Sequence, residues 1–238
     1  MLEKRFNELY NRANQNYYPV FSDFLNLEEQ SVLAKSYLPC VLYGGYEGAE
    51  RVVAGFGDNV CEQDFPIRCV EIKPVNKKFA DKLSHRDFLG GLMNLGIKRE
   101  LLGDIIIFKN SAYLFCLDKI SNYIKDNLSR VSHTTVEVNE VDAPPVKAVE
   151  PKGAEEMVIA SLRVDVAVCQ VYNLSRNECA KLFETDKVFI NSRKLESRSY
   201  QLKEGDMVSV RGYGRFQFVS VVRKTKKDRL VAEMIIYR

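Results

Sequence analysis

The sequence predicts an α+β protein with a small N-terminal α/β region, a regular middle domain and a C-terminal domain with its own core. Three observations predict this fold class. Apolar residues recur at helical and at strand spacing in alternating segments. A proline-rich stretch near Pro144 interrupts both patterns, and the basic residues gather after it. With 238 residues, 46% of them hydrophobic, the chain is long and apolar enough for two or three small domains.

The composition argues against several classes of protein. No apolar run approaches the roughly 18 residues that span a bilayer, so we expect no membrane partner. The opening Met-Leu-Glu-Lys-Arg has no apolar segment behind it, which argues against a secretory signal. The six cysteines form no Cys-x-x-Cys pair, and the only histidines are His85 and His133. We therefore expect reduced cysteines, no metal site and no cofactor.

Residues 1–65 are predicted to form the N-terminal α/β region. Four apolar residues fall on one face of an opening helix: Leu2, Phe6, Leu9 and Tyr10. A second helical stretch follows Ser22 and Asp23, which are candidate caps. Residues 40–43 and 50–54 have the β-branched and aromatic content of two paired strands.

Residues 66–141 show the most regular pattern in the chain. Six segments show a strand or a helix pattern: residues 69–72, 84–95, 105–108, 112–117, 120–128 and 134–138. Their order, β-α-β-β-α-β, is that of the ferredoxin-like frame. RNA-recognition modules use this frame, and so do many unrelated proteins, so the order alone predicts a fold and no function.

A break at residues 142–154 separates this domain from the C-terminal domain, residues 155–238. Three prolines and a glycine in the break favour extended backbone and predict a linker. From Arg163 onward the chain has 16 Lys+Arg against 9 Asp+Glu, which leaves 19 against 23 for the residues before it. A C-terminal excess of +7 is typical of a module that binds a polyanion, although such charges also simply solvate small domains.

Four short motifs in the C-terminal domain resemble the S4 RNA-binding domain. They are Arg163-Val164-Asp165, Leu174-Ser175-Arg176, Lys187-Val188-Phe189-Ile190-Asn191 and Leu202-Lys203-Glu204-Gly205-Asp206. The resemblance covers about 60 residues, with the motifs in the expected order. It departs from the family at Asp186, where many members have glycine.

The same residues have a physical reason to bind phosphate. Ser175 and Glu178 form a capping-box pattern that opens a helix, whose N-terminus presents free N–H groups and a positive dipole end. Arg176 lies just inside that end and can hold a phosphate with two hydrogen bonds; its alternative is a structural ion pair with Asp165. Five further cations can extend the basic face: Arg163, Lys181, Lys187, Arg193 and Lys194.

Arg211-Gly212-Tyr213-Gly214-Arg215-Phe216 follows these motifs. Arg211 and Arg215 supply charge, Tyr213 offers a face on which a base can stack, and the glycines allow close approach. The alternative is a glycine-rich kink between two strands.

The resemblance extends to the whole chain. Residues 83–90, 96–100 and 103–105, together with residues 45–51 and 210–216, are similar to the YlmH family of bacterial RNA-binding proteins. The resemblance implies an RRM-like middle domain, an S4 domain and a cytoplasmic protein. It also implies a factor that associates with rRNA, and with tRNA as a further candidate, on the large ribosomal subunit during rescue of stalled nascent chains.

The middle domain and the N-terminal region leave their partners open. The middle domain contacts either RNA or protein. Four of its residues form a candidate second surface: His85, Arg86, Lys98 and Arg99. The N-terminal region is a candidate for binding a protein partner. The family's earlier link to cell division keeps a division scaffold as an alternative function.

An RNA-modifying enzyme that uses the S4 domain as a targeting arm is a further alternative. Arg163-Val164-Asp165 superficially resembles the catalytic Arg-Leu-Asp of pseudouridine synthases. In those enzymes a large catalytic domain follows the S4 domain, whereas only 73 residues follow Asp165. We therefore expect no catalytic residues and no enzyme activity.

Overall fold

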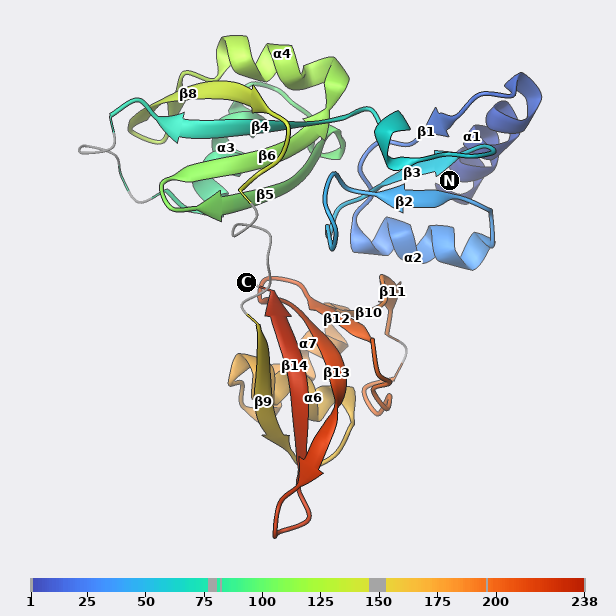
Figure 1. Ribbon diagram of the computed structural model, residues 1–238, viewed down its shortest axis with the longest axis vertical. Helices are drawn as coiled ribbons and strands as arrows, with labels where there is room; N and C mark the ends of the chain where they lie inside the picture. The colour runs from blue at the N-terminus through green and yellow to red at the C-terminus, as the bar shows by residue number, and fades with distance from the viewer. Residues whose placement is uncertain (1, 77–80, 82, 146–152, 196, 238) are drawn as a thin grey trace. The chain divides into compact units, whose positions relative to one another are not determined.

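The protein folds as two compact units, Met1–Val149 and Glu150–Arg238. The computed structural model describes residues 2–76, 81, 83–145, 153–195 and 197–237 (Figure 1). Residues 146–152 of the predicted linker lie outside the described residues. The predicted regions 1–65 and 66–141 both fall in the first unit, so the boundary at residue 65 stays a prediction.

The N-terminal region combines two helices with a small sheet. The helices are α1 (Leu2–Asn16) and α2 (Leu27–Ser36), and the strands are β1 (Val20–Phe21), β2 (Val41–Tyr43) and β3 (Val53–Phe56). The strands form an antiparallel sheet in the order β1-β3-β2, which confirms the predicted pairing of the two longer strands.

The predicted caps of the second helix are wrong. Asn26 caps α2, and with Glu29 it forms a complete capping box. Ser22 instead joins two strands, because its hydroxyl accepts a hydrogen bond from the Ala54 amide at 2.9 Å. Asp23 accepts a hydrogen bond from Arg5 of α1. Both residues therefore stabilise the region away from the helix start.

The middle region contains the predicted β-α-β-β-α-β order with one extra short strand. Its elements are η1 (Glu62–Asp64), β4 (Ile67–Pro74), α3 (His85–Asn94), η2 (Arg99–Leu101), β5 (Leu102–Phe108), β6 (Ser111–Leu117), α4 (Asp118–Asn127), β7 (Arg130–Val131) and β8 (Thr134–Val141). The strands form one antiparallel sheet in the order β5-β6-β4-β8-β7. Helices α3 and α4 cover one face, where Phe88, Leu92 and Ile124 are buried (Figure 1).

The N-terminal region packs against the other face of this sheet. Phe24, Val53 and Phe65 form a buried cluster with two aromatic residues of β6, Tyr113 and Phe115. The exposed fraction of Phe115 is 2%, and that of Tyr113 is 7%. These two aromatic rings are therefore core residues of the first unit.

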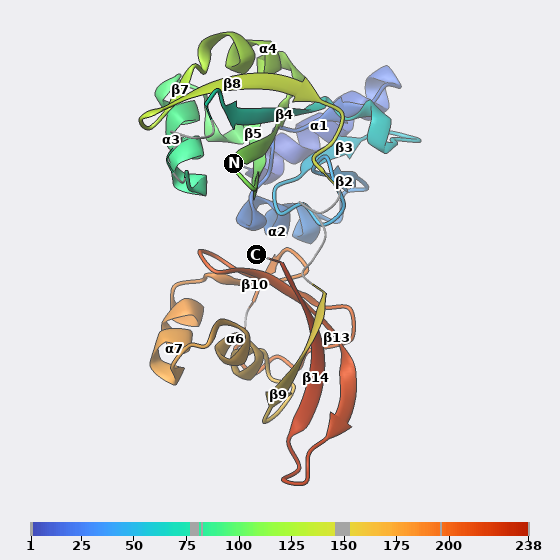
Figure 2. The ribbon, with the colours of Figure 1, turned by 60° about the vertical axis from the view of Figure 1, so that its left-hand side comes forward.

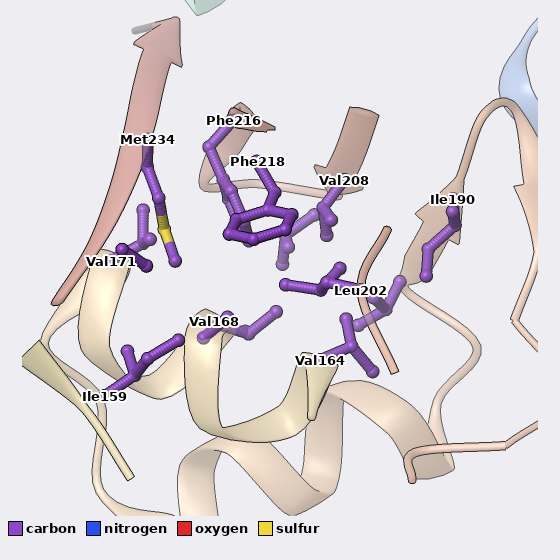
Figure 3. Close-up of a cluster of buried hydrophobic side chains, with 14 of the residues drawn as sticks. Ile159, Val164, Val168, Val171, Ile190, Leu202, Val208, Phe216, Phe218 and Met234 are labelled. Atoms are coloured by element: carbon purple, nitrogen blue, oxygen red, sulfur yellow. The ribbon is translucent and has the colours of Figure 1, made fainter. Parts of the chain in front are cut away.

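In the described residues of the second unit, two short helices pack on a strongly twisted sheet (Figure 2). Its elements are β9 (Ala154–Ile159), α6 (Val164–Tyr172), α7 (Arg176–Glu184), β10 (Val188–Ile190), β11 (Arg193–Lys194), β12 (Met207–Val210), β13 (Gly214–Lys224) and β14 (Leu230–Tyr237). The six antiparallel strands run in the order β11-β10-β12-β13-β14-β9. Val164, Val168 and Val171 of α6 face Phe216 and Phe218 of the sheet (Figure 3).

Two local features of this unit bear on the motifs of the sequence analysis. Asp165 is a candidate cap for α6 in the sequence, but Arg163 occupies the N-cap position, and Asp165 lies inside the first turn. Asp186 has a left-handed φ of 54°, a conformation that glycine adopts freely and that aspartate tolerates better than most residues. This backbone conformation explains why glycine suits the position. Among the described residues, no helix is long and apolar enough to cross a membrane.

Candidate nucleic-acid interface

The start of α7 is built as the sequence predicts. Ser175 is the N-cap, its hydroxyl accepts a hydrogen bond from the Glu178 amide at 3.3 Å, and Glu178 accepts one from the Ser175 amide at 2.9 Å. Asn173, with a left-handed φ of 51°, ends α6 and turns the chain directly into α7. Arg176 is the first residue of α7, and its side chain is exposed.

A groove of about 690 Å³ lies beside this helix start. Among the described residues, its charged lining consists of four arginines and one aspartate: Arg163, Arg176, Arg198, Arg229 and Asp165. These five side chains have a summed formal charge of +3. We call this site the arginine groove. A concave surface with several guanidinium groups beside a helix N-terminus is suited to bind the phosphates of a nucleic acid.

Sequence reasoning missed two of these arginines. Arg198 lies in the loop between β11 and β12, which reaches the groove because Gln201 forms a β-bridge with Arg163. Arg229 directly precedes β14, and the pairing of β14 with β9 brings it there. Neither arginine belongs to a motif, and only strand pairing across distant segments could have located them.

The ion pairs of the groove decide which arginine is available to a ligand. Arg163 holds Asp165 with two hydrogen bonds, Nη2–Oδ2 at 2.6 Å and Nε–Oδ1 at 3.0 Å. This pair raises the pKa of the Arg163 guanidinium. The alternative pairing of Arg176 with Asp165 does not occur, and no hydrogen bond or ion pair of the Arg176 side chain is found within the described part of the chain. Arg176 is therefore free to contact a phosphate.

The other predicted cations of this unit lie outside the groove. Lys181 and Lys187 are exposed, and Lys181 points about 140° away from Arg176 around the axis of α7. Arg193 and Lys194 form β11, where Lys194 pairs with Asp186 at 2.7 Å. The structure thus separates Arg163 and Arg176 from these four residues.

The Arg211–Arg215 segment joins β12 to β13 by a tight turn, as the alternative interpretation expects. Gly212 and Gly214 have φ values of +85° and +112°, which favour glycine. The guanidinium of Arg211 lies 5.4 Å from the ring of Phe189, and that of Arg215 lies 4.8 Å from the ring of Tyr237.

Tyr213 remains open to a partner in this segment. Its side chain is 43% exposed, and its ring lies 5.5 Å from that of Tyr172. Part of Tyr213 is therefore accessible to a partner.

Three residues of the predicted second surface are exposed, and the fourth is held inside the first unit. His85 and Arg86 begin α3, and both are exposed, as is Lys98. Arg99 is instead held inside the first unit, because its Nη1 donates to the carbonyls of Leu102 at 2.6 Å and Gly103 at 3.1 Å. Burial lowers the pKa of Arg99 to about 10. Although His85 is exposed by surface area, neighbouring groups remove part of its ring from water, and this desolvation, followed by the nearby Arg99 charge, lowers the pKa of His85.

Asp104 joins the N-terminal region to the middle region. Its carboxylate accepts hydrogen bonds from the Tyr46 hydroxyl at 2.9 Å and from the amides of Glu50 at 2.7 Å and Arg51 at 3.1 Å. Arg51 in turn donates to the carbonyl of Leu102 at 2.8 Å. The motifs at residues 45–51 and 103–105 therefore stabilise the first unit, and we call this set of contacts the Asp104 junction.

Comparison with known proteins places the chain in a family. A solved structure of the cell division protein ylmH from Streptococcus pneumoniae is 27% identical and covers 63% of this chain and 93% of its own, with a TM-score of 0.49. The ribosome-associated protein quality control protein P2 of Bacillus subtilis (strain 168) is 30% identical over 91% of this chain and 87% of its own length. A family model described as "Putative RNA-binding domain in YlmH" matches residues 61–144. With the family model and this near full-length relative in agreement, the chain belongs to the YlmH family.

Proposed function

We propose that this protein is a non-enzymatic RNA-binding factor of the cytoplasm that associates with the large ribosomal subunit in the rescue of stalled nascent chains. The arginine groove is the observation that carries the proposal. The relative named for ribosome-associated quality control supports the setting, and the family model supports RNA as the ligand. The proposal includes an S4 domain at residues 155–238, an RRM-like middle domain, and contacts with rRNA and tRNA.

The chemistry of the groove favours RNA phosphates over a small anion. The guanidinium groups of Arg176, Arg198 and Arg229 offer donors along one concave surface, which suits the spaced phosphates of a folded RNA strand, while Arg163 is held by Asp165. The free amides at the start of α7 add donors and a positive dipole end at Arg176. Tyr213 offers an aromatic face outside the groove.

Cosedimentation of the full chain with purified large subunits tests the proposal. If about four to six phosphates are engaged, the slope of log affinity against log salt concentration should be roughly −3 to −5. Binding that does not change between low and physiological salt would contradict an electrostatic interface.

Three variants locate the contact. Arg176→Ala should leave the melting temperature unchanged, weaken subunit binding and make the salt slope shallower by about one. Arg176→Lys should restore binding only in part, because a point charge replaces a planar fork. Lys181→Ala is the matched control: it removes a cation from the same helix outside the groove, so it should change binding far less. Equal losses for Arg176→Ala and Lys181→Ala would show that the groove is not the site.

A further inference from the structure

The middle region has a second basic groove on its helical side. The groove has a volume of about 490 Å³ and lies between α3 and the segment that follows α4. Two arginines line it from opposite sides, Arg86 of α3 and Arg130 of β7. We call it the α3–β7 groove; both arginines belong to the first unit, apart from the arginine groove of the second.

The sheet of this region has lost the face on which RNA-recognition modules stack bases. Phe115 lies under the N-terminal region, with the ring of Tyr46 stacked on it at 5.0 Å. Tyr113 donates its hydroxyl hydrogen bond to Glu71 at 2.8 Å, and Lys73 bridges Glu71 and Glu137 on the neighbouring strands. An RNA ligand of residues 61–144 therefore needs a surface other than these aromatic residues.

The charges of the α3–β7 groove favour an anionic ligand. The side chains of Arg86 and Arg130 are exposed, and neither has a hydrogen bond or ion pair among the described residues. Asp87 is the single acidic residue among the described lining residues, and its carboxylate already accepts hydrogen bonds from the amide and the hydroxyl of Ser84, at 2.8 and 2.6 Å. Asn94 and Ser129 add neutral hydrogen-bonding groups to the rim.

Two adjacent glycines in the middle of α3 form part of the groove wall. At Gly91 a Cβ would lie 3.4 Å from the side chain of Val131, at the near edge of ordinary van der Waals contact. At Gly90 packing does not call for glycine at all, since a Cβ would meet nothing within 4 Å. A glycine inside a helix is unfavourable relative to alanine. At Gly90, however, the absence of a side chain leaves the backbone of α3 open to close approach from the groove side.

We propose that the α3–β7 groove binds the sugar–phosphate backbone of RNA. Arg86 and Arg130 contact phosphates from the two walls, and the polar rim contacts phosphate or ribose oxygens. Gly90 lets the strand lie against α3. This inference rests on the proposed RNA-binding function and adds a second contact in a separate unit. Two tethered contacts would raise the effective concentration of each for the same RNA.

The test uses the full chain and rRNA extracted from large ribosomal subunits. Arg86→Ala combined with Arg130→Ala should weaken binding roughly tenfold at low salt and make the salt slope shallower by about two. Lys125→Ala, which removes an exposed cation of α4 outside the groove, is the control and should leave binding within about twofold of wild type.

Gly90→Gln separates binding from stability. Glutamine is a good helix former, so the melting temperature of the first unit should rise by about 1 to 3 °C, while the long side chain fills the groove and weakens rRNA binding. Unchanged rRNA binding in both Gly90→Gln and the double arginine variant overturns the inference. Arg176→Ala, measured in parallel, tells the two proposals apart. If it alone weakens binding, only this inference fails; if no variant weakens binding, the proposed function fails with it.

Discussion

Asp104→Ala should loosen the N-terminal region from the middle region without touching either basic groove. In the Asp104 junction the carboxylate accepts three hydrogen bonds, from Tyr46, Glu50 and Arg51. It also favours the charged forms of two partly buried guanidinium groups, those of Arg51 and Arg99, whose pKa values burial lowers. In Asp104→Ala, the guanidinium groups of Arg51 and Arg99 stay close together, but the carboxylate that stabilised their charged forms is missing.

The magnitude follows from these contacts. A hydrogen bond to a charged group contributes about 1.5 to 3 kcal/mol, and Asp104 accepts three such bonds. Because Asp104 is only half-buried, water can replace part of its bonds. We expect a loss of about 3 to 5 kcal/mol in the free energy of unfolding of the first unit. For a unit of this size that loss lowers the melting temperature by roughly 6 to 20 °C. Asp104→Asn keeps the shape and one accepting oxygen, so its loss should be about half as large.

Calorimetry measures the melting temperature, and binding of a hydrophobic dye reports whether the face around Tyr113 and Phe115 opens. The second unit serves as the internal reference, since all the junction residues named above belong to the first unit. An Asp104→Ala protein that melts within about 2 °C of wild type would refute the reasoning. So would equal losses for the alanine and asparagine variants, because the argument depends on the accepting oxygens.

Two further predictions concern charge near reactive or binding groups. Asp165→Asn removes the negative charge of the arginine groove and frees Arg163. RNA binding should therefore tighten several-fold, and its salt slope should steepen by about 0.7 to 0.9. Weaker binding would show that Asp165 is needed to orient Arg163. The hydrogen bond that the exposed Cys61 thiol donates to Asp64 is the main reason why the pKa of this thiol is raised, and it also lowers the pKa of the Asp64 carboxyl, so less thiolate is present at neutral pH. Alkylation of Cys61 by iodoacetamide near pH 8 should therefore accelerate in Asp64→Ala, and an unchanged rate, followed by mass spectrometry, would contradict this.

Local patterns in the sequence determined the helices and strands and the start of α7. The capping box at Ser175 and Glu178 depends on residues three apart, so its geometry follows from the chain itself. The same holds for the β-α-β-β-α-β order of the middle region, which hydrophobic periodicity predicts. Errors arose where several polar residues competed for one helix start. Ser22 and Asp23 precede α2, yet Asn26, one residue before the helix, is in place to cap it.

Tertiary structure alone decided which basic residues share a site. Arg198 and Arg229 join Arg163 and Arg176 only because a β-bridge and the β9–β14 pairing bring distant segments together. The sequence grouped Arg99 with exposed cations, but its guanidinium faces backbone carbonyls at the Asp104 junction. An arginine can be buried only where the fold supplies hydrogen-bond acceptors. The residues next to the arginine in the sequence do not indicate those acceptors.

The sequence by itself determined the elements, their order and the family, because these depend on periodicity, caps and short motifs. Only the tertiary structure decided that Tyr113 and Phe115 are covered. That outcome depends on Phe24, Val53 and Phe65, which lie some 50 to 90 residues earlier in the chain and bury the aromatic face of β6. Removing that apolar surface from water favours packing over an exposed stacking platform. The physical reason is general: a strand's own pattern specifies which residues share a face, whereas the occupant of that face is set by the rest of the fold.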